Sequence, residues 1–249
     1  MGNKDKDMDN DEFLRRMKAH LKSTASRGNM RGVDPDNPFE IQRHEKEAQE
    51  FLHERLNLEA RILYVHGFAS SGNSNTASCI QKYFPKSKVF SPDLPIDPIE
   101  TLTLLHNIVK REKIDVAIGT SMGGMFCQKL KGVPKVLVNP SFHVSESMRK
   151  KIGIVPFYKQ RNNGATEFMV TQSLCDAYFQ IEKGQFNNIT EKEKSITYGL
   201  FGTDDDVVNC QNEYDMHYTN KMIFVGGHRL SEEIIHDYVV ETILKVLKA

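Results

Sequence analysis

Ser121 is the central residue of a Gly-x-Ser-x-Gly pattern, Gly119-Thr120-Ser121-Met122-Gly123. An apolar stretch at 115–118 precedes the pattern, and a stretch compatible with a helix follows it at 125–130. A serine on a sharp turn from strand to helix has its hydroxyl lifted above the sheet, and flanking glycines permit the close approach of the two elements. We therefore interpret Ser121 as a nucleophile. The pattern alone is common, so this interpretation requires an acid and then a base further along the chain.

His228 is the candidate for the general base. It follows the strand-like residues Met222–Val225 through Gly226 and Gly227, and it precedes the final helical stretch. Among the nine histidines, His143 competes with it, but His143 precedes the acidic candidates and is therefore in the wrong order.

The acid is expected among three adjacent aspartates, Asp204, Asp205 and Asp206, at the end of a predicted strand. The spacing of the segment 202–208 favours Asp205. Its carboxylate would accept the Nδ1 proton of His228 and so present Nε2 to Ser121. We expect Asp204 and Asp206 to cap the following helix.

An oxyanion hole is expected from two backbone amides. One is the amide of Met122, the residue after the nucleophile, and the other is the amide of Phe68 in the first loop, 64–68. Gly67 would let the chain turn so that the Phe68 amide faces the pocket. The side chain of His66 is expected to bond this loop and not to act as a second base.

The same loop offers a rival interpretation. Residues 67–74 have the glycine spacing of a phosphate-binding P-loop, but Asn73 occupies the position of the required lysine. Without that cation nothing would reach the β- and γ-phosphates of a nucleotide, so acyl hydrolysis is favoured over nucleotide hydrolysis.

Short apolar runs that alternate with helical patterns must position these residues. We predict strands at 62–65, 88–90, 116–118, 136–138, 196–201 and 222–225. Continuous Val/Ile/Leu runs are typical of the buried strands of a parallel sheet, which needs a crossover helix between neighbours. The predicted fold is α/β, a doubly wound, mainly parallel sheet of the α/β-hydrolase type with helices on both faces. A last helix at 231–248 is expected to bury Ile235, Val239, Ile243 and Leu247.

We place the boundary of the hydrolase domain at residue 58. Residues 1–57 are highly charged and are expected to form an N-terminal extension with a short helix at 13–22, a linker at 23–37 and a second helix from Pro38 to about Leu56. Domain 58–249 contains an interval of mixed helix and loop, 141–190, that is longer than a core connection needs. We expect this interval to form a lid or a wall of the pocket.

The composition narrows the classes of function. The chain has 33 basic and 33 acidic residues in 249, so its charge gives no reason to expect nucleic acid as a partner. The first ten residues are charged and lack an apolar run of signal-peptide or membrane-span length, so we expect a cytoplasmic protein without a membrane partner. Four dispersed cysteines argue against a zinc site or a disulfide framework, and no metal or cofactor is expected.

Five segments together resemble a known family: 62–72, 119–124, 138–140, 202–208 and 226–228. In this order and spacing they are similar to the YqiA/YcfP-like esterases of the α/β-hydrolase superfamily, over about residues 60–248. The resemblance implies a serine esterase for short-acyl or small esters, and it assigns Ser121, Asp205 and His228 to the catalytic positions. Residues 1–57 have no counterpart in the family's core.

The sequence thus predicts a serine hydrolase that cleaves a small-molecule ester through an acyl-enzyme. A thioesterase or an acyltransferase would use the same residues. The alternative from another class is a non-catalytic binding protein with this fold, which would contact a protein partner or a second copy through the charged extension.

Overall fold

The computed structural model describes residues 38–248. The chain divides into two units at the boundary between Asn57 and Leu58. In the first unit, helix α2 (Pro38–Asn57) confirms the second predicted helix. Two ion pairs at i,i+4 spacing run along it, Arg43–Glu47 and Lys46–Glu50, each 3.8 Å long. The predicted helix at 13–22 and the linker at 23–37 lie outside the described residues.

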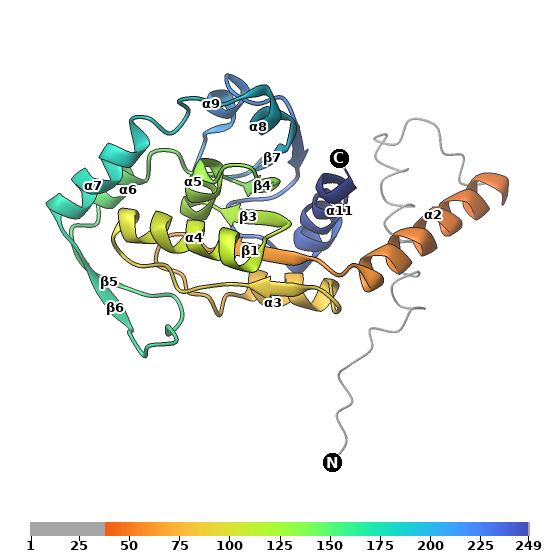
Figure 1. Cartoon of the computed structure of the whole chain (residues 1–249), viewed down its shortest axis with the longest axis horizontal. Helices are drawn as coiled ribbons and strands as arrows, with labels where there is room; N and C mark the ends of the chain where they lie inside the picture. Colours follow the sequence, from red (N-terminus) through yellow and green to blue (C-terminus); the bar gives the residue numbers. More distant parts are fainter. Residues whose placement is uncertain (1–37, 249) are drawn as a thin grey trace, which may run out of the picture. The chain divides into compact units, whose positions relative to one another are not determined.

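The second unit is built on a parallel sheet of six strands (Figure 1). The strands are β1 (Arg61–Val65), β2 (Lys88–Phe90), β3 (Val116–Thr120), β4 (Lys135–Val138), β7 (Thr197–Gly202) and β8 (Lys221–Phe224). Their order in the sheet is β2-β1-β3-β4-β7-β8. All six predicted strands are confirmed. Because β2 and β3 lie on opposite sides of β1, the loops at the carboxyl ends diverge there, and such a point is where open α/β sheets bind ligands.

Helices cover both faces of the sheet, as predicted. Alternate strand residues such as Leu63, Ala117 and Leu137 join one buried cluster with helices α4 (Pro98–Glu112) and α5 (Met122–Lys129). The residues between them, such as Ile118, face the other side and are fully buried. Helices α3 (Asn75–Tyr83) and α11 (Glu241–Lys248) contribute no residue to the first cluster, and α11 contacts β3 and β4.

The last helical stretch buries a partly different set of residues from the predicted one. It begins at Ser231, whose hydroxyl accepts a bond from Ile234 N, and runs through α10 (Glu232–Ile234), the π-helical turn η1 (Ile235–Val240) and α11. Ile235, Val239 and Ile243 are buried as predicted, but Leu247 is only partly buried. The wider π-turn shifts the apolar stripe by about one residue, so Leu244 and Val246 are buried instead.

The interval between β4 and β7 contains helices and loops, as predicted, and also a hairpin that the sequence pattern does not indicate. It holds α6 (Val144–Arg149), α7 (Gln172–Glu182) and α8 (Glu191–Ser195), together with an antiparallel hairpin of β5 (Gly153–Pro156) and β6 (Glu167–Val170). A short helix, α9 (Gln211–Asp215), follows β7. The hairpin lies at the left end of the domain in Figure 1.

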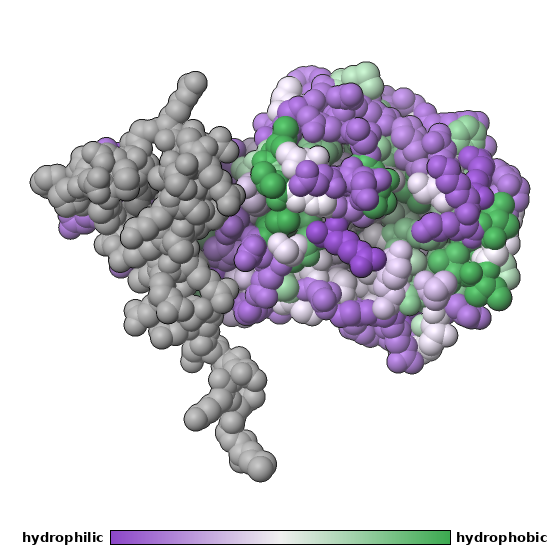
Figure 2. Space-filling model, turned by 180° about the vertical axis from the view of Figure 1, so that it is seen from behind, coloured by the Kyte–Doolittle hydropathy of each residue, from purple (hydrophilic) through white to green (hydrophobic). Residues whose placement is uncertain are grey.

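The hairpin has one packed face and one exposed face. Val155 and Phe168 pack against the buried cluster. The cross-strand pair Ile154 and Met169 points outward and is 63% and 52% exposed. Figure 2 shows hydrophobic side chains at the right edge of the molecule, the end that carries the hairpin. Within the described residues, no helix is long and apolar enough to cross a membrane.

A buried ion pair connects β4 to α8. Lys135 is fully buried, and its Nζ bonds Glu193 Oε2, while Glu193 Oε1 accepts a bond of 2.7 Å from Gly132 N. Burial lowers the pKa of Lys135. Burial also raises the pKa of Glu193, but the bonds from Lys135 and Gly132 outweigh that effect and hold it below its usual value. Both groups therefore need each other to remain charged in the interior.

We predict that Glu193→Gln lowers the free energy of unfolding by about 3 kcal/mol, because it leaves the Lys135 ammonium buried without a counter-charge. The double variant Lys135→Met, Glu193→Gln removes that charge and should regain most of the loss. Urea unfolding of the three proteins measures the difference. A double variant as unstable as the single one would contradict this account.

Candidate active site

Ser121 occupies a left-handed turn between β3 and α5. Its backbone has φ 54° and ψ −122°, a conformation unfavourable for a residue with a Cβ. Hydrogen bonds hold it there: Ser121 N donates to Val138 O at 3.0 Å, and Ser121 O accepts from Ser141 N at 3.0 Å. A Cβ on Gly123 would lie 1.9 Å from Val65 O, so a glycine is required for α5 to approach β1. The turn thus presents Ser121 at the carboxyl end of β3, as predicted for a nucleophile.

Asp205 and His228 come together from the loops after β7 and β8. His228 Nδ1 lies 2.8 Å from Asp205 Oδ2, and the two side chains are 18% and 5% exposed. The other carboxylate oxygen, Oδ1, accepts bonds of 2.9 Å from Val207 N and Val208 N. With the carboxylate as acceptor, Nδ1 carries the proton, and the lone pair of the neutral ring is on Nε2.

The neighbouring aspartates do not cap a helix, so that expectation is wrong. Asp204 and Asp206 are exposed. The next helix, α9, begins only at Gln211, and its N-terminal position is Cys210 without a side-chain cap. The chain after β7 forms a turn instead, and Asp205 is the aspartate that satisfies its amides.

His143 lies elsewhere. Its Nε2 bonds Glu213 Oε2 at 2.7 Å, its side chain is half exposed, and it does not line the pocket that contains Ser121. This location agrees with the choice of His228 from the order of residues along the chain.

A single pocket of about 360 Å³ brings Ser121 and His228 together. Gly67, Phe68 and Met122 line it as well. Within the described residues, no hydrogen bond joins Ser121 Oγ to His228 Nε2; such bonds are often long in sites without a substrate. Asp205 does not line the pocket and lies behind His228.

The predicted oxyanion donors both lie at this pocket. Met122 is the first residue of α5, so its amide has no acceptor within the helix. Neither the Met122 amide nor the Phe68 amide donates a hydrogen bond to another described residue. A Cβ on Gly67 would lie 3.3 Å from Ser121 Cβ, which shows how closely the first loop passes the serine. Two free amides beside one hydroxyl can bind an oxyanion.

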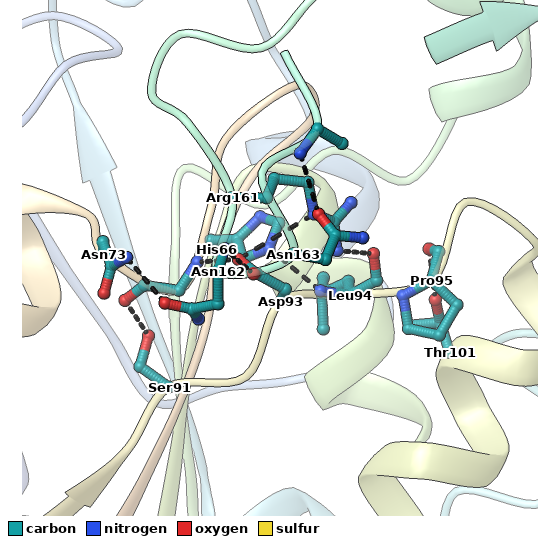
Figure 3. A network of polar contacts seen from close by, with 12 residues as sticks. His66, Asn73, Ser91, Asp93, Leu94, Pro95, Thr101, Arg161, Asn162 and Asn163 are labelled. Atoms are coloured by element: carbon teal, nitrogen blue, oxygen red, sulfur yellow. Dashed lines mark hydrogen bonds and ion pairs between the residues drawn. The ribbon is translucent and has the colours of Figure 1, made fainter. Parts of the chain in front are cut away.

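His66 connects the first loop to the segment before α4 (Figure 3). Its Nε2 accepts a bond of 3.2 Å from Leu94 N, so Nδ1 is the protonated atom and donates to Gly67 O at 2.9 Å. Burial lowers the pKa of His66 to about 4. The ring is therefore neutral, with both nitrogens engaged, and the structure confirms that it bonds the loop.

Asp93 and Arg161 extend this network to the hairpin (Figure 3). Asp93 accepts bonds of 2.7 Å from Gly72 N and from Asn162 N, and Arg161 Nη2 donates to Leu94 O. Burial raises the pKa of Asp93, but the two amide bonds and the charge of Arg161 outweigh it and hold the pKa below its usual value. In a P-loop, the backbone amides of the loop bind phosphate. Here the amide of Gly72 donates to the carboxylate of Asp93 instead, which argues against nucleotide binding at this loop.

Asn139 is a positioning residue that the sequence analysis missed. It follows β4 in a left-handed conformation (φ 43°) and is almost fully buried. Its Oδ1 accepts from Gly202 N at 2.8 Å, and its Nδ2 donates to Gly227 O at 3.2 Å. One side chain therefore ties the loop that carries Asp205 to the loop that carries His228. The signal in the sequence is the Val-Asn-Pro segment at 138–140, in which an asparagine directly follows a predicted strand.

Side chains that could bind a metal ion do not cluster in the part of the chain that the structure describes. No group of three or more His, Cys, Asp or Glu side chains is placed to hold an ion there. Cys127, Cys175 and Cys210 are buried free thiols, and Cys79 is partly buried.

Known proteins share this architecture. The model of an uncharacterised protein family, UPF0227, matches residues 61–234. The esterase Est1E from Butyrivibrio proteoclasticus superposes with a TM-score of 0.54 at 13% identity, over 78% of this chain and 91% of that chain. The Paleococcus ferrophilus monoacylglycerol lipase gives a TM-score of 0.54 at 13% identity, over 75% and 94%. An esterase domain of a Rhodothermus marinus protein gives 0.53 at 14% identity, over 78% and 89%. At these identities the similarity shows the fold, and the predicted α/β-hydrolase fold is confirmed.

We predict that His66 makes stability depend on pH. Its folded pKa of about 4 lies below the ordinary histidine value of 6.5, so the unfolded chain takes up the proton first as the pH falls. Above pH 6.5 His66 is neutral in both states and costs no stability. As the pH drops to 4, protonation of the unfolded chain lowers the free energy of unfolding by about 3 kcal/mol. His66→Asn removes the titration, so the stability gap between wild type and variant should narrow with falling pH in urea titrations. Parallel curves would contradict this assignment.

Proposed function

Since the chain belongs to the uncharacterised protein family UPF0227 and has the α/β-hydrolase fold, we propose that it is a serine hydrolase of small or short-acyl carboxylic esters. The match bears out the resemblance to the YqiA/YcfP-like esterases stated from the sequence. A pocket of about 360 Å³ is near the lower limit for ligand sites, which favours a small substrate.

In the proposed mechanism, Ser121 Oγ attacks the ester carbonyl while His228 Nε2 accepts its proton. Asp205 holds the ring and stabilises the imidazolium that forms. The Phe68 and Met122 amides bind the oxyanion, each contributing about 3 kcal/mol to the stability of the tetrahedral intermediate. His228 then protonates the leaving alcohol, and a water molecule releases the acyl group from Ser121 by the same route.

The observation that carries the proposal is the 2.8 Å bond between His228 Nδ1 and a buried carboxylate, on a histidine that lines one pocket with Ser121. This bond orients the base and assigns its tautomer, which a surface histidine does not need. A non-catalytic binding protein would have no reason to keep the acid, the base and two free amides around one serine.

Thioesterase and acyltransferase chemistry use the same residues and differ in the leaving group or in the acceptor of the acyl group. Contact of a partner through residues 1–57 and a cytoplasmic location stay predictions from the sequence.

We predict that a fluorophosphonate probe labels the wild-type protein and fails to label Ser121→Ala, because the probe reacts with an activated serine hydroxyl. Hydrolysis of 4-nitrophenyl acetate and butyrate should be lost in the same variant. Ser147→Ala, which removes another hydroxyl of the pocket, is the control and should still be labelled. Labelling that persists in Ser121→Ala would exclude this serine as the nucleophile.

We predict that Asp205→Asn lowers kcat by about a thousandfold or more, because the amide favours the wrong tautomer of His228. Asp204→Asn and Asp206→Asn change exposed side chains of the same loop and serve as matched controls with little effect. Steady-state kinetics on a 4-nitrophenyl ester compares the three variants. Equal losses at all three positions would show that Asp205 has no special role.

A further inference from the structure

The pocket that contains Ser121 and His228 is rich in positive charge. Two basic side chains, Lys151 and Arg229, line it, and among the described residues that line it there is no Asp or Glu. The whole chain has 33 basic and 33 acidic residues. The excess of positive charge is therefore a property of this pocket and not of the composition.

The described residues supply no partner carboxylate to either cation. In the described part of the chain, no ion pair or hydrogen bond joins Lys151 or Arg229 to a carboxylate. Arg149, two positions before Lys151, behaves differently and pairs with Asp176 at 3.1 Å. Two uncompensated cations at one pocket raise the local concentration of anions.

Aromatic rings hold both cations at the loop that carries the Phe68 amide. Lys151 Nζ lies 5.5 Å from the centre of the Phe68 ring. Arg229 Cζ lies 5.7 Å from the centre of the Tyr158 ring, and Tyr158 N donates to Ala69 O at 2.9 Å. Cation–π contacts leave the N–H groups available to a ligand. Both cations thus line the same pocket as Ser121, and no described carboxylate is bonded to their N–H groups.

The remaining polar side chains of the pocket suit the same kind of ligand. They are mostly hydroxyl groups, among them Ser70 and Ser74, which can donate to an anion without repelling it. Arg229 also follows His228 directly in the chain, and both residues line the pocket.

We propose that the ester substrate carries an anionic group, a carboxylate or a phosphate, which Lys151 and Arg229 bind while the ester carbonyl faces Ser121. This inference rests on the proposed esterase function and names its substrate class. Both residues determine specificity and take no part in the transfer of the acyl group or the proton.

The test compares kcat/KM for matched pairs of esters. On the acyl side, 4-nitrophenyl hemisuccinate is compared with 4-nitrophenyl butyrate, which has the same number of acyl carbons and no charge. On the alcohol side, the butyrate ester of glycerol 3-phosphate is compared with monobutyrin. We expect a preference of about tenfold for the anionic member of at least one pair at low salt, decreasing as salt screens the charges. A preference in the acyl pair identifies the anionic group as a carboxylate, and a preference in the alcohol pair identifies it as a phosphate.

Variants assign the preference to the two cations. Lys151→Met and Arg229→Met should each lower the ratio of anionic to neutral kcat/KM about threefold, the size of one exposed ion pair. Lys150→Met changes an exposed neighbour that does not line the pocket and should leave the ratio unaltered. An equal change in Lys150→Met would indicate a general surface charge effect and overturn the proposal.

The two levels of the hypothesis fail separately. If neutral esters are hydrolysed through Ser121 but neither pair shows a preference, or the preference survives in both Lys151→Met and Arg229→Met, this inference is wrong and the esterase function stands. If no ester of either pair is hydrolysed, the proposed function itself is wrong.

Discussion

The left-handed backbone at Ser121 is the constraint on which the rest of the site depends. A residue with a Cβ holds φ 54° here only because β4 and the chain after it bond both its N–H and its carbonyl. The same turn requires α5 to begin in contact with β1, where a Cβ on Gly123 would overlap Val65 O. Consequently the free amides of α5 and the loop after β1 meet at the hydroxyl of Ser121, and the pocket forms around it.

The side chains of Asp205 and His228 are brought to this point by contacts between loops. Parallel strands bring their carboxyl ends to one edge of the sheet, so the loops after β7 and β8 start near Ser121. Their final placement comes from side-chain bonds: Asn139 links the two loops, and two backbone amides orient the carboxylate of Asp205. The geometry of the proposed base therefore depends on residues that do no chemistry themselves.

The interval between β4 and β7 gives the pocket its particular character. Lys151 and Tyr158 come from the chain around β5, and Asp93 and Arg161 bond that segment to the loops after β1 and β2. The charge of the pocket is thus supplied by the insertion and by Arg229, while the proposed catalytic groups are supplied by the sheet. Because the two sets of residues come from different parts of the chain, proteins with this fold can share catalytic groups and still bind different ligands.

The sequence by itself determined the six strands, because buried parallel strands need continuous apolar runs, and it determined the turn at Ser121, because small residues must flank it. It narrowed the acid to three aspartates and favoured Asp205 by spacing. Only the tertiary structure showed Asp205 bonded to His228, the hairpin β5–β6, and the cations of the pocket. The reason is physical: local periodicity encodes which side of an element is buried, whereas contacts between distant residues depend on which surfaces meet after the chain has folded.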